Sequence, residues 1–186
     1  MARASGASGA PESAGPSGPG GTGGQPGPAG GSATRLRRMV PADLGDVLDL
    51  EHDLFPDDPW TARMFAEEVD QPPESRLYLI AEADGGRAMA GYAGLMFVPG
   101  GTQADVLTIA VARAYWGRGI GSALLSALIA AAVERGCAEV FLEVREDNAR
   151  ARGLYLRRGF EEIGIRRGYY QPSGVNAIVM RKDLLR

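Results

Sequence analysis

The 186-residue sequence has a single cysteine, Cys137, and a single histidine, His52. One cysteine excludes an internal disulfide and a cysteine-rich zinc site. His52 has no neighbouring cluster of ligand residues, so we expect no metal. A cysteine nucleophile would need a histidine base, which makes an acyl-cysteine intermediate a poor hypothesis.

Long apolar runs and an excess of positive charge are also missing. No segment approaches the ~20 apolar residues that a membrane-spanning helix requires. The formal net charge is -3, whereas nucleic-acid binders usually carry a basic face. We therefore expect a cytoplasmic protein with no membrane partner and no direct nucleic-acid partner.

Residues 1–34 lack Leu, Ile, Val and aromatic residues and contain 11 Gly and 5 Pro. Such a segment cannot bury enough apolar surface to offset the entropy lost on ordering. It also has neither the apolar run of a secretory signal nor the arginine-rich pattern of a transit peptide. We expect a disordered Gly/Pro/Ser-rich tail over 1–34 and one domain over 35–186.

Within 35–186, hydrophobic residues alternate between strand and helix periods. The resulting order of elements is β-α-α-β-β-β-α-β-α-β-β. The clearest helix covers 119–135, where Ile120, Leu124 and Leu128 form one apolar stripe and Gly136 ends it. Interior βαβ units and flanking hairpins predict an α/β (mixed α+β) fold, with a central mixed β-sheet flanked by helices.

Three glycines, Gly117, Gly119 and Gly121, lie between a predicted strand and this helix in the stretch "WGRGIGS". A glycine-rich turn at a helix N-terminus leaves backbone N–H groups unpaired, and the helix dipole favours an anion there. The stretch matches neither the P-loop nor the G-x-G-x-x-G pattern. Phosphate binding and tight helix–strand packing both remain possible explanations of the glycines.

A larger set of motifs is more specific. The stretches "LTIAVARAYWGRGIGSALLSALI", "LEVREDNARARGLYLRRGF" and "IRRGYY" together resemble the GCN5-related N-acetyltransferase (GNAT) superfamily. With "FPDDPWTARMF", they resemble in particular its ribosomal-protein-alanine N-acetyltransferases. The resemblance covers 35–184 and implies a single GNAT-like domain that uses acetyl-coenzyme A.

The resemblance also implies a coenzyme site. The superfamily's pyrophosphate motif, Gln/Arg-x-x-Gly-x-Gly/Ala, falls on 116–121, with Trp116 in place of its polar first residue. Its backbone donors would be Arg118, Gly119, Ile120, Gly121 and Ser122. Ile109 and Val111 would align the pantetheine arm by strand-like hydrogen bonds. Asn148 would bond the same arm, although it fits a helix N-cap equally well.

Four further residues acquire roles by resemblance. Glu143 corresponds to the general base and Tyr155 to the acid that protonates the departing thiolate. Tyr169 and Tyr170 correspond to residues that line the acceptor groove. From the pattern alone, Glu143 is equally a salt-bridge partner, Tyr155 a core aromatic, and the tyrosine pair the aromatics of a surface strand.

The acceptor follows in part from acid–base chemistry. An α-amine has a pKa near ~7.8 and a lysine side chain near ~10.4, so lysine needs roughly 3.5 kcal/mol more to lose its proton at neutral pH. This favours a protein N-terminal peptide; the resemblance makes it an N-terminal alanine, probably that of a small-subunit ribosomal protein. The alternatives are acetylation of a small-molecule amine or a lysine, and a non-catalytic coenzyme A-binding module.

Overall fold

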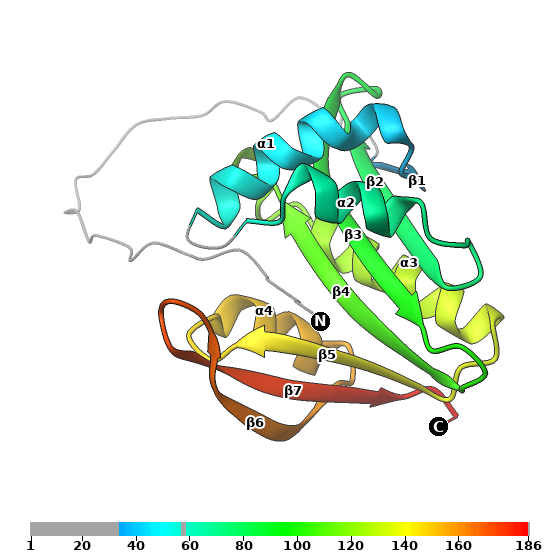
Figure 1. Ribbon diagram of the computed structural model, residues 1–186, viewed down its shortest axis with the longest axis vertical. Coiled ribbons are helices and arrows are strands. Elements are labelled where there is room, and N and C mark those ends of the chain that lie inside the picture. Colours follow the sequence, from blue (N-terminus) through cyan, green and yellow to red (C-terminus); the bar gives the residue numbers. More distant parts are fainter. Residues whose placement is uncertain (1–33, 57–58, 186) are drawn as a thin grey trace, which may run out of the picture.

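The computed structural model describes residues 34–56 and 59–185. The expected tail, 1–34, therefore lies outside the described residues except for Thr34. Within them the elements follow the predicted order, as Figure 1 shows. They are β1 (Arg35–Arg38), η1 (Pro41–Asp43), α1 (Leu44–Leu54), α2 (Ala62–Val69), β2 (Arg76–Ala83), β3 (Ala88–Phe97), β4 (Gln103–Val111), η2 (Arg113–Tyr115), α3 (Ile120–Glu134), β5 (Glu139–Arg145), α4 (Ala149–Arg157), β6 (Glu161–Tyr170) and β7 (Val175–Asp183).

The strands form one mixed sheet in the order β1-β2-β3-β4-β5-β7-β6. All neighbouring pairs are antiparallel except β4 and β5, which are parallel. The parallel ladder is short, since it joins only Gln103–Asp105 to Glu139–Phe141. Beyond it the two strands diverge (Figure 1), and we call the diverging segments 106–111 of β4 and 142–145 of β5 the fork.

The helices divide between the two faces of the sheet. The stripe predicted on α3 is confirmed, because Ile120, Leu124 and Leu128 are buried in one core cluster with α4. A second cluster packs α1 and α2 against β2–β4 on the other face. No helix in the described part of the chain is both long and apolar enough to cross a membrane.

Short-range signals fix the start of α2. The Thr61 hydroxyl accepts a hydrogen bond from the Met64 N–H at 3.3 Å, so Thr61 is the predicted N-cap. The ring of Trp60, just before the cap, packs on Phe65 with centroids 5.1 Å apart. This hydrophobic staple sets the direction in which the chain enters the helix.

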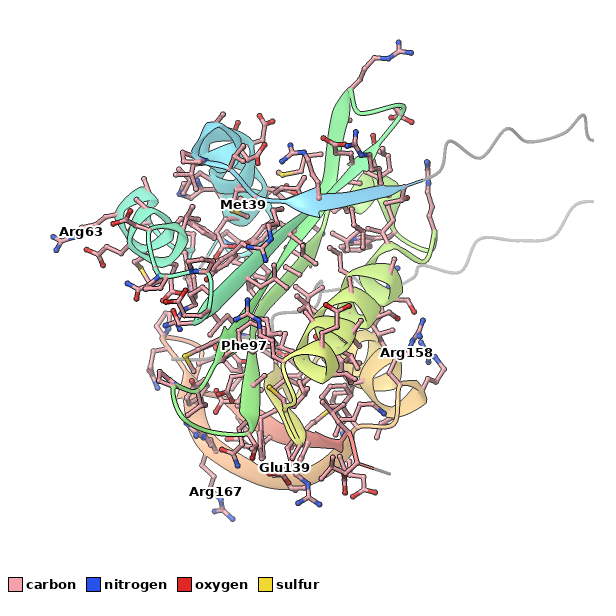
Figure 2. All side chains as sticks on the ribbon, turned by 90° about the vertical axis from the view of Figure 1, so that its right-hand side faces the viewer. Met39, Arg63, Phe97, Glu139, Arg158 and Arg167 are labelled. Carbon is pink, nitrogen blue, oxygen red and sulfur yellow. The ribbon has the colours of Figure 1, made fainter. Side chains whose placement is uncertain are left out.

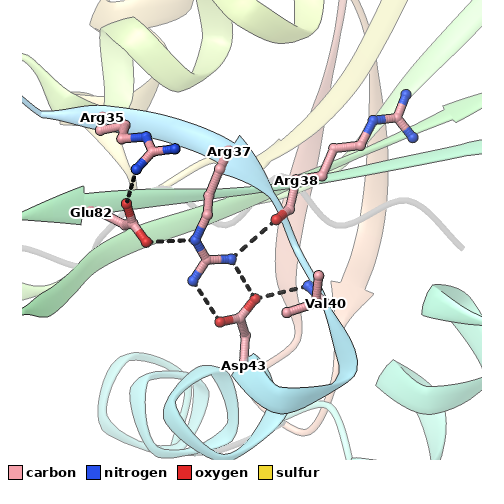
Figure 3. Close-up of polar contacts among 6 residues, drawn as sticks. All are labelled: Arg35, Arg37, Arg38, Val40, Asp43 and Glu82. Atoms are coloured by element: carbon pink, nitrogen blue, oxygen red, sulfur yellow. Dashed lines mark hydrogen bonds and ion pairs between the residues drawn. The ribbon is translucent and has the colours of Figure 1, made fainter. Parts of the chain in front are cut away.

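Arg37 ties the edge strand β1 to the rest of the domain (Figure 3). Its guanidinium donates two 2.7 Å hydrogen bonds to the Asp43 carboxylate and one of 2.5 Å to Glu82 on β2. Asp43 also accepts from the Val40 N–H at 2.8 Å. The hydrogen bond from Arg37 holds the pKa of Asp43 below its usual value.

Candidate active site

The turn between β4 and α3 requires glycine at two positions. Gly117 and Gly119 have φ of +78° and +79°, which side chains of L-residues rarely adopt. Gly119 is the N-cap of α3 and brings no side chain to the exposed donors. The first helical bond runs from the Ala123 N–H to the Gly119 carbonyl. The N–H groups of Ile120, Gly121 and Ser122 therefore have no acceptor within the helix.

Packing does not account for these glycines. A Cβ placed at Gly117 or Gly119 would meet nothing within 4 Å. At Gly121 it would meet Val111 and Leu154 at ordinary contact distances of 3.6 and 3.7 Å. Gly121 thus keeps open a space that a side chain would occupy, and tight helix–strand packing does not explain the motif.

This space is a cavity of about 460 Å³ between β4, the glycine turn, α3 and α4. It is large enough for part of a cofactor-sized ligand. Seven of the predicted site residues line it: Ile109, Val111, Gly119, Ile120, Gly121, Ser122 and Tyr155. The other five, Arg118, Glu143, Asn148, Tyr169 and Tyr170, lie outside its lining.

Three arginines of the cavity were missed from sequence. Arg150, Arg157 and Arg158 line it at the α4 side and give it positive charge. Arg158 donates to the Ser122 hydroxyl, which joins α4 to the first turn of α3 (Figure 2). The repeated arginines of "NARARGLYLRR" were the available signal, and a cationic rim suits a polyanionic ligand.

Trp116 has a structural role that its departure from the motif did not predict. Its indole Nε1–H donates to the Val111 carbonyl at 2.6 Å, which ties the turn back to the end of β4. The guanidinium of Arg150 lies 4.8 Å from the centroid of the indole ring and that of Arg113 lies 5.3 Å away. The tryptophan therefore helps to fix the turn and two of the arginines beside it.

Glu143 lies on β5 in the fork, two residues beyond the last rung of the parallel ladder. Its side chain is only 7% exposed. One carboxylate oxygen pairs with Arg166 Nε of β6 at 2.9 Å, and the other, Oε2, is buried without a hydrogen-bond partner. Both interpretations of the sequence thus hold in part, since a salt bridge uses one oxygen and leaves the second available.

Asn148 and Tyr155 come from α4. Asn148 Oδ1 accepts from the Ala151 N–H at 3.0 Å, which is the predicted N-cap, while its buried Nδ2 has no partner. Tyr155 is 1% exposed, packs edge-on against Phe160 and lines the cavity. Burial raises the pKa of the Tyr155 phenol well above its usual value, so the hydroxyl keeps its proton at neutral pH.

The tyrosine pair ends β6. Tyr169 and Tyr170 contact edge-to-face, with ring centroids 5.2 Å apart. Tyr170 is buried, with the Arg145 guanidinium 5.3 Å from its ring, so it is not a surface aromatic. Tyr169 has Arg166 5.5 Å from its ring, and Arg166 in turn pairs with Glu143. Arg166 thus connects Tyr169 to the carboxylate in the fork.

A second buried carboxylate, Glu51 of α1, was also missed. It is 3% exposed and accepts from the Trp60 N–H at 2.9 Å and from the Tyr92 hydroxyl. It therefore fixes the end of the α1–α2 connection against β3. A glutamate on the apolar side of an amphipathic helix was the signal.

Comparisons with known proteins agree with this geometry. The model of the Acetyltransferase (GNAT) family matches residues 44–160. The N-alpha-acetyltransferase RimI of Mycobacterium tuberculosis is 42% identical over 149 residues, covering 78% of this chain and 89% of that protein. The [ribosomal protein bS18]-alanine N-acetyltransferase of Escherichia coli K12 is 38% identical over 124 residues, covering 66% and 79%.

Solved structures show the same fold. The crystal structure of the ribosomal-protein-S18-alanine N-acetyltransferase from Escherichia coli superposes with a TM-score of 0.72 at 32% identity, covering 82% of this chain and 94% of that one. Ard1 from Thermoplasma volcanium gives 0.73 at 26% identity, covering 83% and 99%. The mixed sheet with helices on both faces is therefore a fold that the chain shares with these two proteins.

Proposed function

The chain belongs to the acetyltransferase (GNAT) family and is an N-acetyltransferase, and from this premise we propose that it transfers acetyl from acetyl-coenzyme A to the N-terminal α-amine of a protein, an alanine of a small-subunit ribosomal protein. One observation carries the proposal: a buried glutamate with an unpartnered oxygen lies in the fork beside a glycine-rimmed cationic cavity. The names of the relatives give the acceptor class. A ribosomal substrate places the enzyme in the cytoplasm.

The cavity fits coenzyme A. Acetyl-coenzyme A supplies the acetyl group as a thioester. The N–H groups of the turn and of the first turn of α3 (118–122) bind its pyrophosphate, with Arg150, Arg157 and Arg158 as counter-charges. Ile109 and Val111 bond the pantetheine arm along the fork, and the buried Nδ2 of Asn148 donates to it.

The catalytic groups act in sequence. Glu143 accepts the proton of the α-ammonium, through a water molecule, and leaves the neutral amine that attacks the thioester carbonyl. A main-chain N–H of the β4 segment at Ile109–Val111 stabilises the oxyanion that develops on that carbonyl. Tyr155 then gives its proton to the departing thiolate, which its raised pKa allows at neutral pH.

The acceptor peptide lies against the opposite side of the fork. Tyr169 and Tyr170 line its groove beside Glu143, and their rings support the first residues of the chain. A single carboxylate that works through water is matched to an α-amine of pKa near ~7.8 and poorly matched to a lysine.

A panel of acceptors tests the proposal. Purified protein is incubated with acetyl-coenzyme A and peptides beginning with Ala, Ser, Met or Gly, an N-terminally blocked peptide with an internal lysine, and small amines. Mass spectrometry then locates the acetyl group. The expected result is acetylation of the α-amine of the Ala peptide; acetylation confined to lysine or to small amines contradicts it.

A further inference from the structure

Asp105 lies on β4 where the fork opens, opposite Phe141 in the last rung of the parallel ladder. The residues on either side of it, Ala104 and Val106, are buried in the cluster that contains α3. Because successive side chains of a strand point to opposite faces, Asp105 is on the face away from α3 and α4.

Glu143 is on that same face. Its neighbours on β5, Leu142 and Val144, pack into the α3–α4 cluster, so the glutamate points the other way. Arg166 reaches it from β6, two strands along the sheet. Asp105, Glu143 and Arg166 therefore share one face of the sheet at the fork.

The charges of this group do not balance. Burial raises the pKa of Asp105, the negative charge of Glu143 raises it further, and Arg166 lowers it. Within residues 34–56 and 59–185, no hydrogen bond to Asp105 is formed, and Glu143 Oε2 is buried without a partner. The other nearby cation, Arg145, bonds Asp147 at 2.8 Å. Two carboxylates thus face a single guanidinium.

That guanidinium is easily displaced. The Arg166 side chain is 59% exposed, whereas that of Glu143 is 7% exposed. An exposed arginine loses little free energy when it moves into water, but a buried carboxylate needs a cationic donor to replace it. The site around Glu143 is therefore built to hold a positively charged hydrogen-bond donor that can change.

Resting on the proposed function, we propose that Asp105 and Glu143 together bind the acceptor as its protonated ammonium, and that Arg166 holds the place of this ammonium until the acceptor enters. An α-amine is mostly protonated at neutral pH, so the site captures the major species. One N–H bond of the ammonium then breaks as its proton passes through water to Glu143. Arg166 remains beside Tyr169, whose ring it already contacts.

Paired peptides test the role of Asp105. One begins with alanine, and its des-amino analogue begins with a propionyl group of nearly the same shape. Calorimetric titration of the coenzyme A-bound protein should show the amine peptide binding about tenfold more tightly to the wild type. Asp105→Asn should abolish most of this preference and Asp105→Glu should retain it. An unchanged preference in Asp105→Asn overturns the proposal.

Kinetics give an independent measurement. Asp105→Asn should raise KM for the peptide about tenfold while kcat changes less than about twofold. Glu134→Gln, on the exposed end of α3, makes the same change in net charge away from the fork and should change neither constant. A fall in kcat at constant KM would assign Asp105 to the chemical step and contradict binding of the ammonium.

Arg166→Met tests the placeholder. Without the competing guanidinium, KM for the peptide should fall or stay constant while kcat is retained. A large loss of kcat would mean that Arg166 orients Glu143 during the reaction, which overturns this part of the proposal. The proposed function fails separately, if the wild-type enzyme acetylates no peptide α-amine; failure of the present inference leaves that acetylation intact.

Discussion

The two halves of the sheet are covered differently. Strands β2–β4 are buried on both faces, since they contribute to the α3–α4 cluster and to the α1–α2 cluster. Strands β5, β6 and β7 contribute only to the first, and the first seven residues of β6 are exposed; Figure 2 shows Arg167 of this strand extending away from the body. The first half is a rigid support, while the second leaves one face open beside Glu143.

The difference between the halves predicts a division of labour. Substitutions around the fork should change turnover or ligand binding with little effect on stability. Substitutions in the first half, away from the fork, should change stability and leave turnover intact.

Glu143→Gln should have the largest effect. It keeps the shape of the side chain but removes the base, so kcat at saturating acetyl-coenzyme A should fall about 10²- to 10⁴-fold. Calorimetry should find the affinity for coenzyme A nearly unchanged. A normal rate would remove Glu143 from the mechanism and, with it, the functional half of the comparison.

Tyr155→Phe should lower kcat about 10²-fold, because the thiolate then leaves without its proton donor. The phenyl ring fills the same buried space, so thermal unfolding should change little. Normal activity in this variant would return Tyr155 to a purely packing role.

Gly121→Ala should weaken coenzyme A binding about tenfold, because the new methyl group projects into the cavity between Val111 and Leu154. Its thermal stability should hold. Gly119→Ala is the matched variant: its φ of +79° makes any side chain strained, so it should lose about 1 kcal/mol of stability. Calorimetry and thermal unfolding distinguish the two, and equal loss of stability in both would contradict the open-cavity explanation.

Asp43→Asn tests the first half of the sheet. The pKa of Asp43 is depressed in the folded state, so its ion pair stabilises above the usual carboxyl pKa near ~4 and is lost as the pH falls through the lower folded value. Above pH 5 the variant should be about 1–2 kcal/mol less stable than the wild type, and the difference should vanish in acid. Turnover should be unchanged. Glu67→Gln, in an exposed ion pair with Arg63, is the control that should barely alter unfolding at either pH.

Deleting residues 1–34 should have the smallest effect. Their composition gives them almost nothing to bury, so we propose that 35–186 is the catalytic domain. The melting temperature and the acetylation rate of the shortened protein should match those of the full chain. A large drop in either would show that the segment packs on one of the two halves.

Sequence predicted the fold well because its signals are local. The Thr61 cap, the staple of Trp60 on Phe65 and the stripe of α3 depend on neighbours within a few residues, and the structure confirms each. The glycine turn was predictable for the same reason, since positive φ at Gly117 and Gly119 follows from residue type.

Long-range pairings could not be predicted. Arg166 and Glu143 are 23 positions apart and meet only because β7 lies between β5 and β6. Asp105 reaches the same face through a register that no periodicity specifies. The contact of Trp116 with the Val111 carbonyl likewise needs the fold of the turn.

The short pairing of β4 with β5 has a consequence for solubility as well as for chemistry. Strands with unpaired backbone groups at the periphery of a sheet are templates for unwanted association. Here the ladder stops after three rungs, so main-chain donors and acceptors are released in the middle of the sheet, flanked by protein on both sides. The molecule thereby keeps a strand edge that a slender ligand can extend, at a place that another protein's strand cannot easily reach.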